Sequence, residues 1–374
     1  MHSHFVCQAS VWARMGGVLT RAQAVAAELT DVLGVHVDAA TIVTGRAALL
    51  GLRRPGRISA GGATRLMPAG DGWWALTLSR ADDIEAVPAL IETDAVPADP
   101  WPAVEEWSAT RGGADVVERA ALLGLPAARL GETAPAAPVV RMSGRRTEAR
   151  TATGLLVADL SSMWAGPLCG QLLAAAGATV VKVESPGRPD GTRAGDQRFY
   201  DWMNHGKLSY SVDFDSNRLA ALLAVADVVI EGSRPGVLAR RGLSPDTLAG
   251  PDGRIWLRIT GHGPDSQRAA FGDDAAVAGG LVDTSPSGPV FSGDAIADPL
   301  TGLEAALAVA HSLQRGGGET IEVAMAAVAA TYAALTAETP MPSSPPQITA
   351  AASALGADNA TVEALVQQRS SVAC

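Results

Sequence analysis

An apolar stretch, a helical pattern and a second apolar stretch follow one another within about 30 residues near the middle of the chain. Residues 155–160 are almost entirely apolar, a helix is expected from 166 to 176, and GATVVKVES supplies the second strand. Two strands joined by a helix lie parallel in one sheet, because a parallel pair needs a long crossover connection. Further elements are predicted as strands at 208–213, 228–231 and 255–260 and a helix at 217–224. The sequence therefore predicts an α/β protein with an open, parallel, Rossmann-like sheet.

Ligands of such a sheet bind beyond the carboxyl ends of its strands. In this chain those places are 161–166, 184–193, 231–236 and 261–264. The first loop, SSMWAGP, has a single glycine, so it matches neither the G-x-G-x-x-G of dinucleotide-binding folds nor a P-loop. A nicotinamide or flavin dehydrogenase is a minor alternative, since Glu184 ends the second strand where a ribose-binding acid would stand.

The composition of the 374 residues excludes several classes of function. The formal net charge of −10 argues against a nucleic-acid surface, which needs clustered Lys and Arg. Cys7, Cys169 and Cys374 form no CxxC pair and predict no disulfide framework. No apolar run reaches the roughly 18 residues of a membrane span, and the N-terminus lacks the pattern of a signal peptide. We expect a cytoplasmic protein without a metal site, a membrane partner or a nucleic-acid partner.

The chain before the parallel sheet predicts a separate, smaller α+β domain. Gly70-Asp71-Gly72 lies between two short apolar runs, which indicates a hairpin, and helical patterns follow it. Trp73 and Trp74 are expected to pack across this hairpin rather than on a ligand. The predicted division is a small domain at 1–132, a Pro-, Ala- and Arg-rich linker at 133–153, the parallel-sheet domain at 154–335, and a Pro- and Ser-rich connection with a final helix at 336–374.

Two carboxylates in the segment 288–308, GPVFSGDAIADPLTGLEAALA, are the candidates for chemistry. Asp298 precedes Pro299, which predicts that Asp298 is the N-cap of a helix and Pro299 its first residue. A capped helix without chemistry is the plain alternative. Small residues such as Gly293 and Gly302 let backbone or ligand come close to the first turn, and the helix dipole favours an ionised carboxylate there. Asp294 is the second carboxylate of this segment.

Several motifs, in order, resemble those of the family III CoA-transferases, whose relatives are the α-methylacyl-CoA racemases. These motifs are DLSSMWAGPLCGQLLAAAGATVVKVESPGRPDGTR, MNHGKLSYSVDF, ADVVIEGSRPGVLARRGL, ITGHG, FGDDAAVAGGL and GDAIADPLTGLEAALAV. The resemblance covers nearly all of 155–330, and ALGADNATVEALVQQR resembles the family's closing helix.

The resemblance implies a CoA-transferase that moves CoA from an acyl-CoA thioester to a carboxylic acid. Asp298 fits the family's catalytic aspartate, which forms a mixed anhydride and then an aspartyl-CoA thioester. An aspartate with an ordinary pKa of about 3.9 is ionised at pH 7 and needs no general base. Peptide N–H groups near Gly302 or in 288–293 are candidates for stabilising the oxyanion. The resemblance also implies a homodimer and no tightly bound cofactor, with acyl-CoA and a carboxylic acid as substrates.

CoA, by the same resemblance, lies along the carboxyl edge of the sheet. Positive side chains at matching positions suit its phosphates, and Gly166 lets the ligand approach the backbone. The implied CoA-binding residues are Trp164, Gly166, Arg188, Arg193, Asn204, Lys207 and Arg234.

The chain departs from the family pattern in three places. Ser185 replaces the basic residue that usually follows the acid of the second strand, so Arg188 is expected to take its place. The turn 232–236 lacks the usual aromatic residue. Sequence that resembles the family's small domain comes first in this chain rather than last. This order indicates a permuted or fused and trimmed version of the fold. The family's interlocked dimer is therefore not expected to form in its usual way.

Two alternatives to the transferase remain open at the level of sequence. A racemase needs two acid/base groups, one on each face of the substrate carbon, and the related racemases pair the aspartate with the histidine of a G-H-D motif. The stretch here is Gly272-Asp273-Asp274, which favours a transferase but leaves either aspartate as a second acid/base group. The altered loops also leave open a non-catalytic acyl-CoA-binding member of the family.

Overall fold

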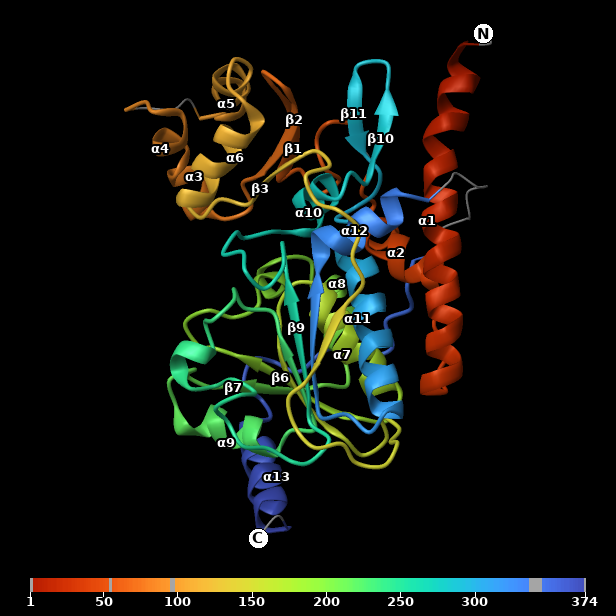
Figure 1. Ribbon diagram of the computed structural model, residues 1–374, viewed down its shortest axis with the longest axis vertical. Helices are drawn as coiled ribbons and strands as arrows, with labels where there is room; N and C mark the ends of the chain where they lie inside the picture. The colour runs from red at the N-terminus through yellow and green to blue at the C-terminus, as the bar shows by residue number, and fades with distance from the viewer. Residues whose placement is uncertain (1–2, 54–55, 95–97, 336–344, 373–374) are drawn as a thin grey trace.

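The computed structural model describes residues 3–53, 56–94, 98–335 and 345–372 of the chain (Figure 1). A large, mostly parallel sheet with its helices fills the lower part of Figure 1, and a smaller unit of strands and helices lies above it. The predicted α/β fold class, with an additional α+β unit from the N-terminal part of the chain, is confirmed.

Within the described residues the large sheet has seven strands, in the order β4-β12-β9-β8-β5-β6-β7. Its strands are β4 Val139–Met142, β5 Leu156–Leu160, β6 Thr179–Glu184, β7 Leu208–Ser211, β8 Val228–Glu231, β9 Ile255–Thr260 and β12 Glu319–Ala324. Every neighbouring pair is parallel except β4 and β12. The predicted strands at 228–231 and 255–260 are confirmed without a change of bounds, and those at 155–160 and 208–213 with small ones.

Helices cover both faces of this sheet. The helices of this part of the chain are α7 Ala165–Ala175, α8 Gln197–Asn204, α9 Asn217–Val225, α10 Gly272–Ala278, α11 Ala297–Gln314, α12 Met325–Ala333 and α13 Asn359–Val372, with 3₁₀ turns at Gly191–Ala194 and Ala239–Arg241. Of these, α10 packs on the smaller unit, where Val277 shares a core with Leu66 and Ala75. Asp196 and Ser216 cap α8 and α9 by accepting hydrogen bonds from peptide N–H groups of the first turn. Residues of α7 and α11 share one core with one face of the sheet, and α9 and α13 pack on the other.

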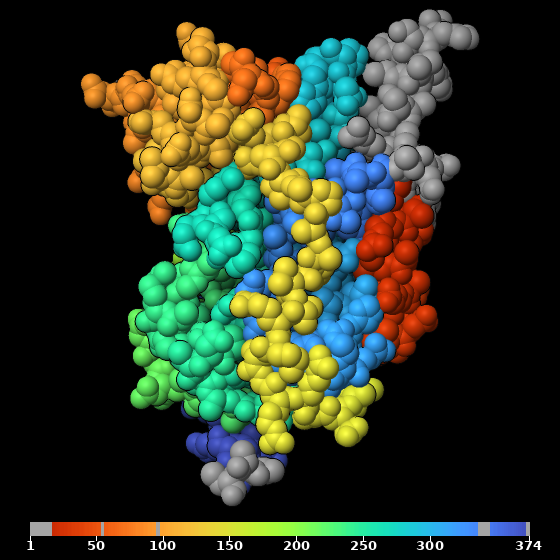
Figure 2. All heavy atoms as spheres, viewed as in Figure 1, coloured from red at the N-terminus to blue at the C-terminus, as the bar shows by residue number. Residues whose placement is uncertain are grey.

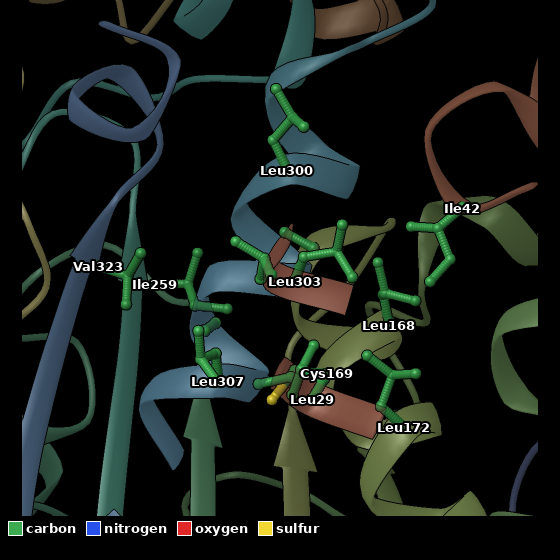
Figure 3. Packing of buried hydrophobic residues seen from close by; sticks show 14 of the residues in the cluster. Leu29, Ile42, Leu168, Cys169, Leu172, Ile259, Leu300, Leu303, Leu307 and Val323 are labelled. Carbon is green, nitrogen blue, oxygen red and sulfur yellow. The ribbon is translucent and has the colours of Figure 1, made fainter. Parts of the chain in front are cut away.

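Helix α11 is buried along most of its length because its first turns pack against α7. Leu300, Leu303 and Leu307 lie in the same apolar cluster as Leu168 and Leu172 (Figure 3). A Cβ at position 302 would come within 2.7 Å of Leu168 and 2.8 Å of the Ala165 carbonyl oxygen. Glycine at this position therefore serves the close approach of two helices.

The smaller unit has a core of its own. Its elements are β1 Thr64–Ala69, β2 Gly72–Thr77, α3 Ala81–Glu85, α4 Val87–Ile91, α5 Trp101–Ser108, α6 Gly113–Leu122 and β3 Ala127–Arg129. The predicted hairpin at Gly70-Asp71-Gly72 is confirmed, since β1 and β2 are antiparallel and Ala69 pairs with Gly72. Trp74 is fully buried in this core, as expected for a packing residue, while Trp73 lies below the guanidinium of Arg57.

The two N-terminal helices belong to the core of the large sheet, in contrast to the predicted small domain at 1–132. They are α1 Ser3–Leu33 and α2 Ala39–Leu50. Leu19, Val25 and Leu29 of α1 are buried with residues of α11, so the apolar side of α1 completes that core. We therefore propose a division in which the smaller unit begins after α2. No helix among the described residues has the length and apolar character to cross a bilayer.

The predicted linker at 133–153 is only partly irregular. Its middle forms β4, which pairs with β12 at the edge of the large sheet. Figure 2 shows this segment, in yellow, crossing the face of the molecule from the smaller unit to the bottom of the sheet. Val139, Val140 and Met142 on this strand are exposed. The predicted final helix is α13, and the Pro- and Ser-rich connection lies mostly in 336–344, outside the described residues.

A second hairpin precedes α11. It consists of β10 Val282–Ser285 and β11 Gly288–Phe291, so most of the segment 288–293 is a strand rather than the expected loop. A Cβ on Gly288 would come within 2.5 Å of the Trp73 ring, which places this hairpin against the smaller unit.

Candidate active site

Asp298 lies in the first turn of α11 with its side chain buried. The helix begins at Ala297 after Ile296, so the predicted N-cap position of Asp298 is wrong. A Cβ on Gly272 would come within 2.3 Å of Oδ2 of Asp298, so residue 272 must be glycine for the carboxylate to fit. The peptide N–H of Gly272 also donates a hydrogen bond to Asp298. The first residue of α10 therefore both makes room for this carboxylate and binds it.

Three more aspartates gather near Asp298, and together they form what we call the acidic cluster: Asp273, Asp274, Asp294 and Asp298. Asp273 accepts a hydrogen bond from the N–H of Ala295 at 3.0 Å, which ties α10 to the loop before α11. Two hydroxyls of the smaller unit reach the same cluster. Thr64 donates to Asp273 at 3.2 Å, and Thr77 donates to Asp274 at 2.9 Å. The cluster therefore lies where the smaller unit meets the parallel-sheet part of the chain.

The cation that faces the acidic cluster is Arg46 on α2. Its Nη1 is 2.8 Å from Oδ1 of Asp294. Its guanidinium carbon lies 5.1 Å from the ring centroid of Phe199 and 5.6 Å from that of Trp164. Trp164, Phe199 and Trp202 contact one another edge to face, so the guanidinium is held between an aromatic wall and a carboxylate.

One cation does not offset the burial of four carboxylates. Burial raises the pKa of Asp298 to about 7, with Arg46 acting against this and the charge of Asp273 adding to it. Burial likewise raises the pKa of Asp294 to about 6 and that of Asp274 to about 7. Asp298 therefore differs from the aspartate with an ordinary pKa of about 3.9 that the sequence led us to expect, because burial raises its pKa. Among the described residues, no group of acids, histidines or cysteines is arranged to hold a metal ion.

A second group of buried charges lies at the carboxyl edge of the sheet, and we call it the lysine–aspartate cluster: Asp159, Lys182, Asp190 and Lys207. Nζ of Lys182 is 2.7 Å from Asp190, and Nζ of Lys207 is 2.9 Å from Asp159. Burial alone would raise the pKa of Asp190, but Lys182 lowers it to about 2. These charges are matched in number, two lysines to two aspartates, although burial lowers the pKa of Lys207.

The model of a known family matches residues 153–360, which is more than half of the chain, and it is described as "CoA-transferase family III". The chain belongs to CoA-transferase family III. The match includes three elements of the candidate site, namely α10, the loop before α11, and α11 itself. It leaves out α2, and with it Arg46.

Relatives that are named as CoA transferases are identical to this chain at about one third of the aligned residues. A formyl-CoA:oxalate CoA-transferase of Afipia carboxidovorans is 31% identical over 198 residues, 47% of this chain and 47% of the relative. An acyl-CoA transferase of Fusarium pseudograminearum is 33% identical over 177 residues, 40% and 39% of the two chains. The chain thus spans about half the length of the curated relatives it matches.

Two solved structures are similar to part of this chain. A CAIB/BAIF family protein from Brucella suis is 30% identical, with a TM-score of 0.45 over 50% of this chain and 56% of the other. A hypothetical protein from Mycobacterium tuberculosis is 30% identical, with a TM-score of 0.44 over 50% and 57%.

Several of the residues that the family III resemblance predicts for CoA also contact other parts of this chain. Lys207 donates to Asn204 and Asp159, and Asn204 donates to the Tyr200 carbonyl. Arg193 pairs with Glu184 at 2.6 Å and stacks on the Tyr200 ring at 4.3 Å. These contacts stabilise the edge of the sheet. The carboxylate of Glu184, the candidate ribose-binding acid, forms its ion pair with Arg193.

The first predicted CoA loop is likewise packed against its own chain. A Cβ on Gly166 would come within 2.1 Å of Oγ of Ser161, so the small residue is required by the loop itself. Trp164 is buried in the aromatic wall that faces Arg46. Trp164 is thereby linked to the acidic cluster through that arginine.

Arg188 and Arg234 differ from the other predicted residues because they are exposed. Arg188 follows β6 and forms an isolated bridge with Ser185, while Arg234 follows β8. Both lie at the carboxyl edge of the sheet, where the resemblance places CoA, but apart from the acidic cluster. Their role in binding CoA stays a prediction.

Arg46 was not predicted from the sequence, and of the lysine–aspartate cluster only Lys207 was, as a CoA-binding residue. Arg46 lies in an Ala- and Leu-rich helical segment with no motif around it. Lys182 did carry a signal, because a lysine in the middle of the apolar run TVVKVE predicts a buried charge that needs a partner.

Proposed function

We propose that this chain is the catalytic part of a CoA-transferase that moves CoA from an acyl-CoA to a carboxylic acid, with Asp298 as the nucleophile. Membership of family III and the family names of the relatives support CoA transfer. The observation that carries the choice of nucleophile is the buried Asp298 carboxylate, whose pKa is raised to about 7 at the junction of the two units. A carboxylate that is poorly solvated gains more from attack on a carbonyl than one in water.

In the proposed reaction the Asp298 carboxylate attacks the thioester carbonyl, the C–S bond breaks, and CoA leaves as a thiolate. The thiolate then attacks the aspartyl carbonyl of the anhydride, which releases the donor acid and leaves an aspartyl-CoA thioester. The acceptor carboxylate attacks this thioester and expels the thiolate, which attacks the acceptor carbon of the new anhydride. The product is the new acyl-CoA, and Asp298 is again a free carboxylate.

Direct trapping tests this proposal. The protein is incubated with a series of acyl-CoA donors and carboxylic acids, with and without hydroxylamine, and products and peptides are identified by mass spectrometry. We expect a new thioester for at least one pair and a hydroxamate at Asp298. The exposed Asp115→Asn serves as the matched control and should behave as the wild type. A new thioester formed at the wild-type rate by Asp298→Asn would overturn the proposal.

Racemisation of an acyl-CoA is a second candidate, favoured by one observation. Asp273 is half-buried near Asp298 and its pKa is also raised, mainly by burial, so two acid groups share the site. Wash-in of deuterium at the α-carbon without CoA exchange would favour this function. Binding of acyl-CoA with neither outcome would favour a non-catalytic family member. The implied homodimer stays a prediction, which light scattering of the purified protein checks.

A further inference from the structure

Arg46 reaches the acidic cluster from a part of the chain that the family model does not match. It is on α2, and Asp294 is 248 residues further along the chain. Its side chain is 23% exposed and that of Asp294 is 3% exposed, so this ion pair is largely shielded from water. Such a pair is costly to bury unless its geometry is well fixed.

The position of Arg46 is fixed from two sides. The rings of Phe199 and Trp164 face its guanidinium on one side, and Asp294 accepts from Nη1 on the other. Among the described residues, its Nε and the second oxygen of Asp294 have no hydrogen-bond partner although both atoms are buried. The hydrogen-bonding capacity of the guanidinium is therefore only partly used by Asp294.

The charged groups that face Asp298 come from three elements. Arg46 comes from α2, Asp294 from the loop before α11, and Asp273 from α10, where the N–H of Gly272 also points at Asp298. Helix α7, which packs against α11, has no charged side chain in its sequence AGPLCGQLLAA. Arg46 is therefore the cationic side chain among these neighbours, and Asp294 and Asp273 compete with Asp298 for its charge.

We propose that Arg46 is the positioning residue that keeps Asp298 ionised for attack, and that Asp294 limits this effect by sharing the guanidinium. The inference rests on the proposed nucleophilic role of Asp298. Among the described residues, Arg46 donates a hydrogen bond to Asp294 and none to Asp298, so it acts on Asp298 through its electrostatic field. Within a buried site a nearby opposite charge favours the ionised carboxylate, and a like charge disfavours it.

The two partners of the ion pair therefore predict opposite effects. Arg46→Gln removes the cation and should move the midpoint of the acidic limb of the rate profile upward by about one to two pH units. At pH 7 this lowers the rate of hydroxamate formation by about five- to fiftyfold, because less Asp298 is ionised. Asp294→Asn keeps an oxygen for Arg46 but removes a competing charge, so its midpoint should move downward.

The pH dependence of single-turnover hydroxamate formation tests this proposal in the full chain. Arg46→Lys keeps the positive charge and should restore part of the wild-type midpoint. Arg21→Gln is the matched control, since Arg21 is an arginine of α1 that pairs with Glu304 of α11 away from the acidic cluster, and its midpoint should equal that of the wild type. An unchanged midpoint in either Arg46→Gln or Asp294→Asn would overturn the proposal. If Arg46→Gln does not fold, the direction of the Asp294→Asn shift decides.

A second readout separates this proposal from the proposed function. The pH dependence of the unfolding free energy is measured for four chains: the wild type, Asp298→Asn, Arg46→Gln and the double variant. The wild type is compared with Asp298→Asn, and Arg46→Gln is compared with the double variant. The difference reports the pKa of Asp298 without any turnover. A wild type that forms no hydroxamate at any pH refutes the transferase proposal alone. A pKa of Asp298 that does not depend on Arg46 refutes the role of Arg46 alone.

Discussion

The acidic cluster and the lysine–aspartate cluster are both buried groups of charges, but only the second is balanced. Lys182 and Lys207 each pair with one aspartate, and Lys182 lowers the pKa of Asp190 to about 2. In the acidic cluster Arg46 faces several aspartates, and burial raises the pKa of Asp298 to about 7. Matched buried charges fix a structure, whereas an unmatched set leaves a group that changes protonation near neutral pH.

The largest expected effect separates the two clusters by activity. Asp298→Asn should lower CoA transfer by at least about 10⁴-fold, the scale seen when other enzymes lose a covalent nucleophile. The chain should stay folded, because an uncharged amide of similar shape replaces a buried carboxyl whose pKa is raised. Steady-state rates and circular dichroism check both parts. Substantial residual transfer would show that the unbalanced cluster is not the reacting one.

Breaking the balanced cluster should instead change stability. Lys207→Met leaves Asp159 buried without its cation, which costs about 3–5 kcal/mol of unfolding free energy. Urea denaturation measures this loss. Arg218→Met, which removes an exposed ion pair with Glu363, is the control and should cost under about 1 kcal/mol. Equal losses in the two variants would contradict a structural role for the lysine–aspartate cluster.

The pH dependence of stability should have opposite signs in the two clusters. Folded Asp298 holds its proton up to about pH 7, above the ordinary pKa of 3.8, so its contribution to stability is present at low pH and is lost as the pH rises. Over that window the wild type should lose about 1.4 kcal/mol per pH unit relative to Asp298→Asn. The pKa of Asp190 is lowered to about 2, so its contribution is lost as the pH falls below its ordinary value. Denaturation of wild type, Asp298→Asn and Asp190→Asn across pH checks both signs.

The smallest effect is expected outside both clusters. Arg188 is exposed, so Arg188→Gln should change the free energy of unfolding by less than about 0.5 kcal/mol. If it binds a CoA phosphate, the dissociation constant for CoA should rise up to about fivefold, as for an exposed ion pair. Calorimetric titration with CoA measures this change. A loss of stability comparable to that of Lys207→Met would contradict the exposed position.

The sequence predicts five of the seven strands described in the large sheet, because each of those five carries its own signal, but it does not predict β4 or β12. The apolar runs at β8 and β9 predict strands from their local pattern, without information on distant residues. The choice of Asp298 as candidate nucleophile stays a prediction, based on an aspartate before a proline in a small-residue segment and on the order of the family motifs. The exact helix start differed, since Ala297 already has helical geometry.

The remainder of the site depends on contacts that sequence order does not contain. Arg46 and Asp294 are 248 positions apart, and nothing near Arg46 marks it as a partner of a carboxylate. The protonation of Asp298 depends on how deeply it is buried, which only the assembled fold determines. Lys207 matches a family position, but its ammonium group donates hydrogen bonds to Asp159 and Asn204. The residue type alone does not reveal these partners.

Titration of the aspartate carboxyl carbons by NMR, with Asp298→Asn and Asp190→Asn for assignment, tests the central claim most directly. We predict that Asp298 titrates near pH 7 while Asp190 stays ionised down to about pH 2. An Asp298 that titrates near its ordinary value of 3.8 would contradict the account, because the carboxylate would then be neither desolvated nor short of positive charge.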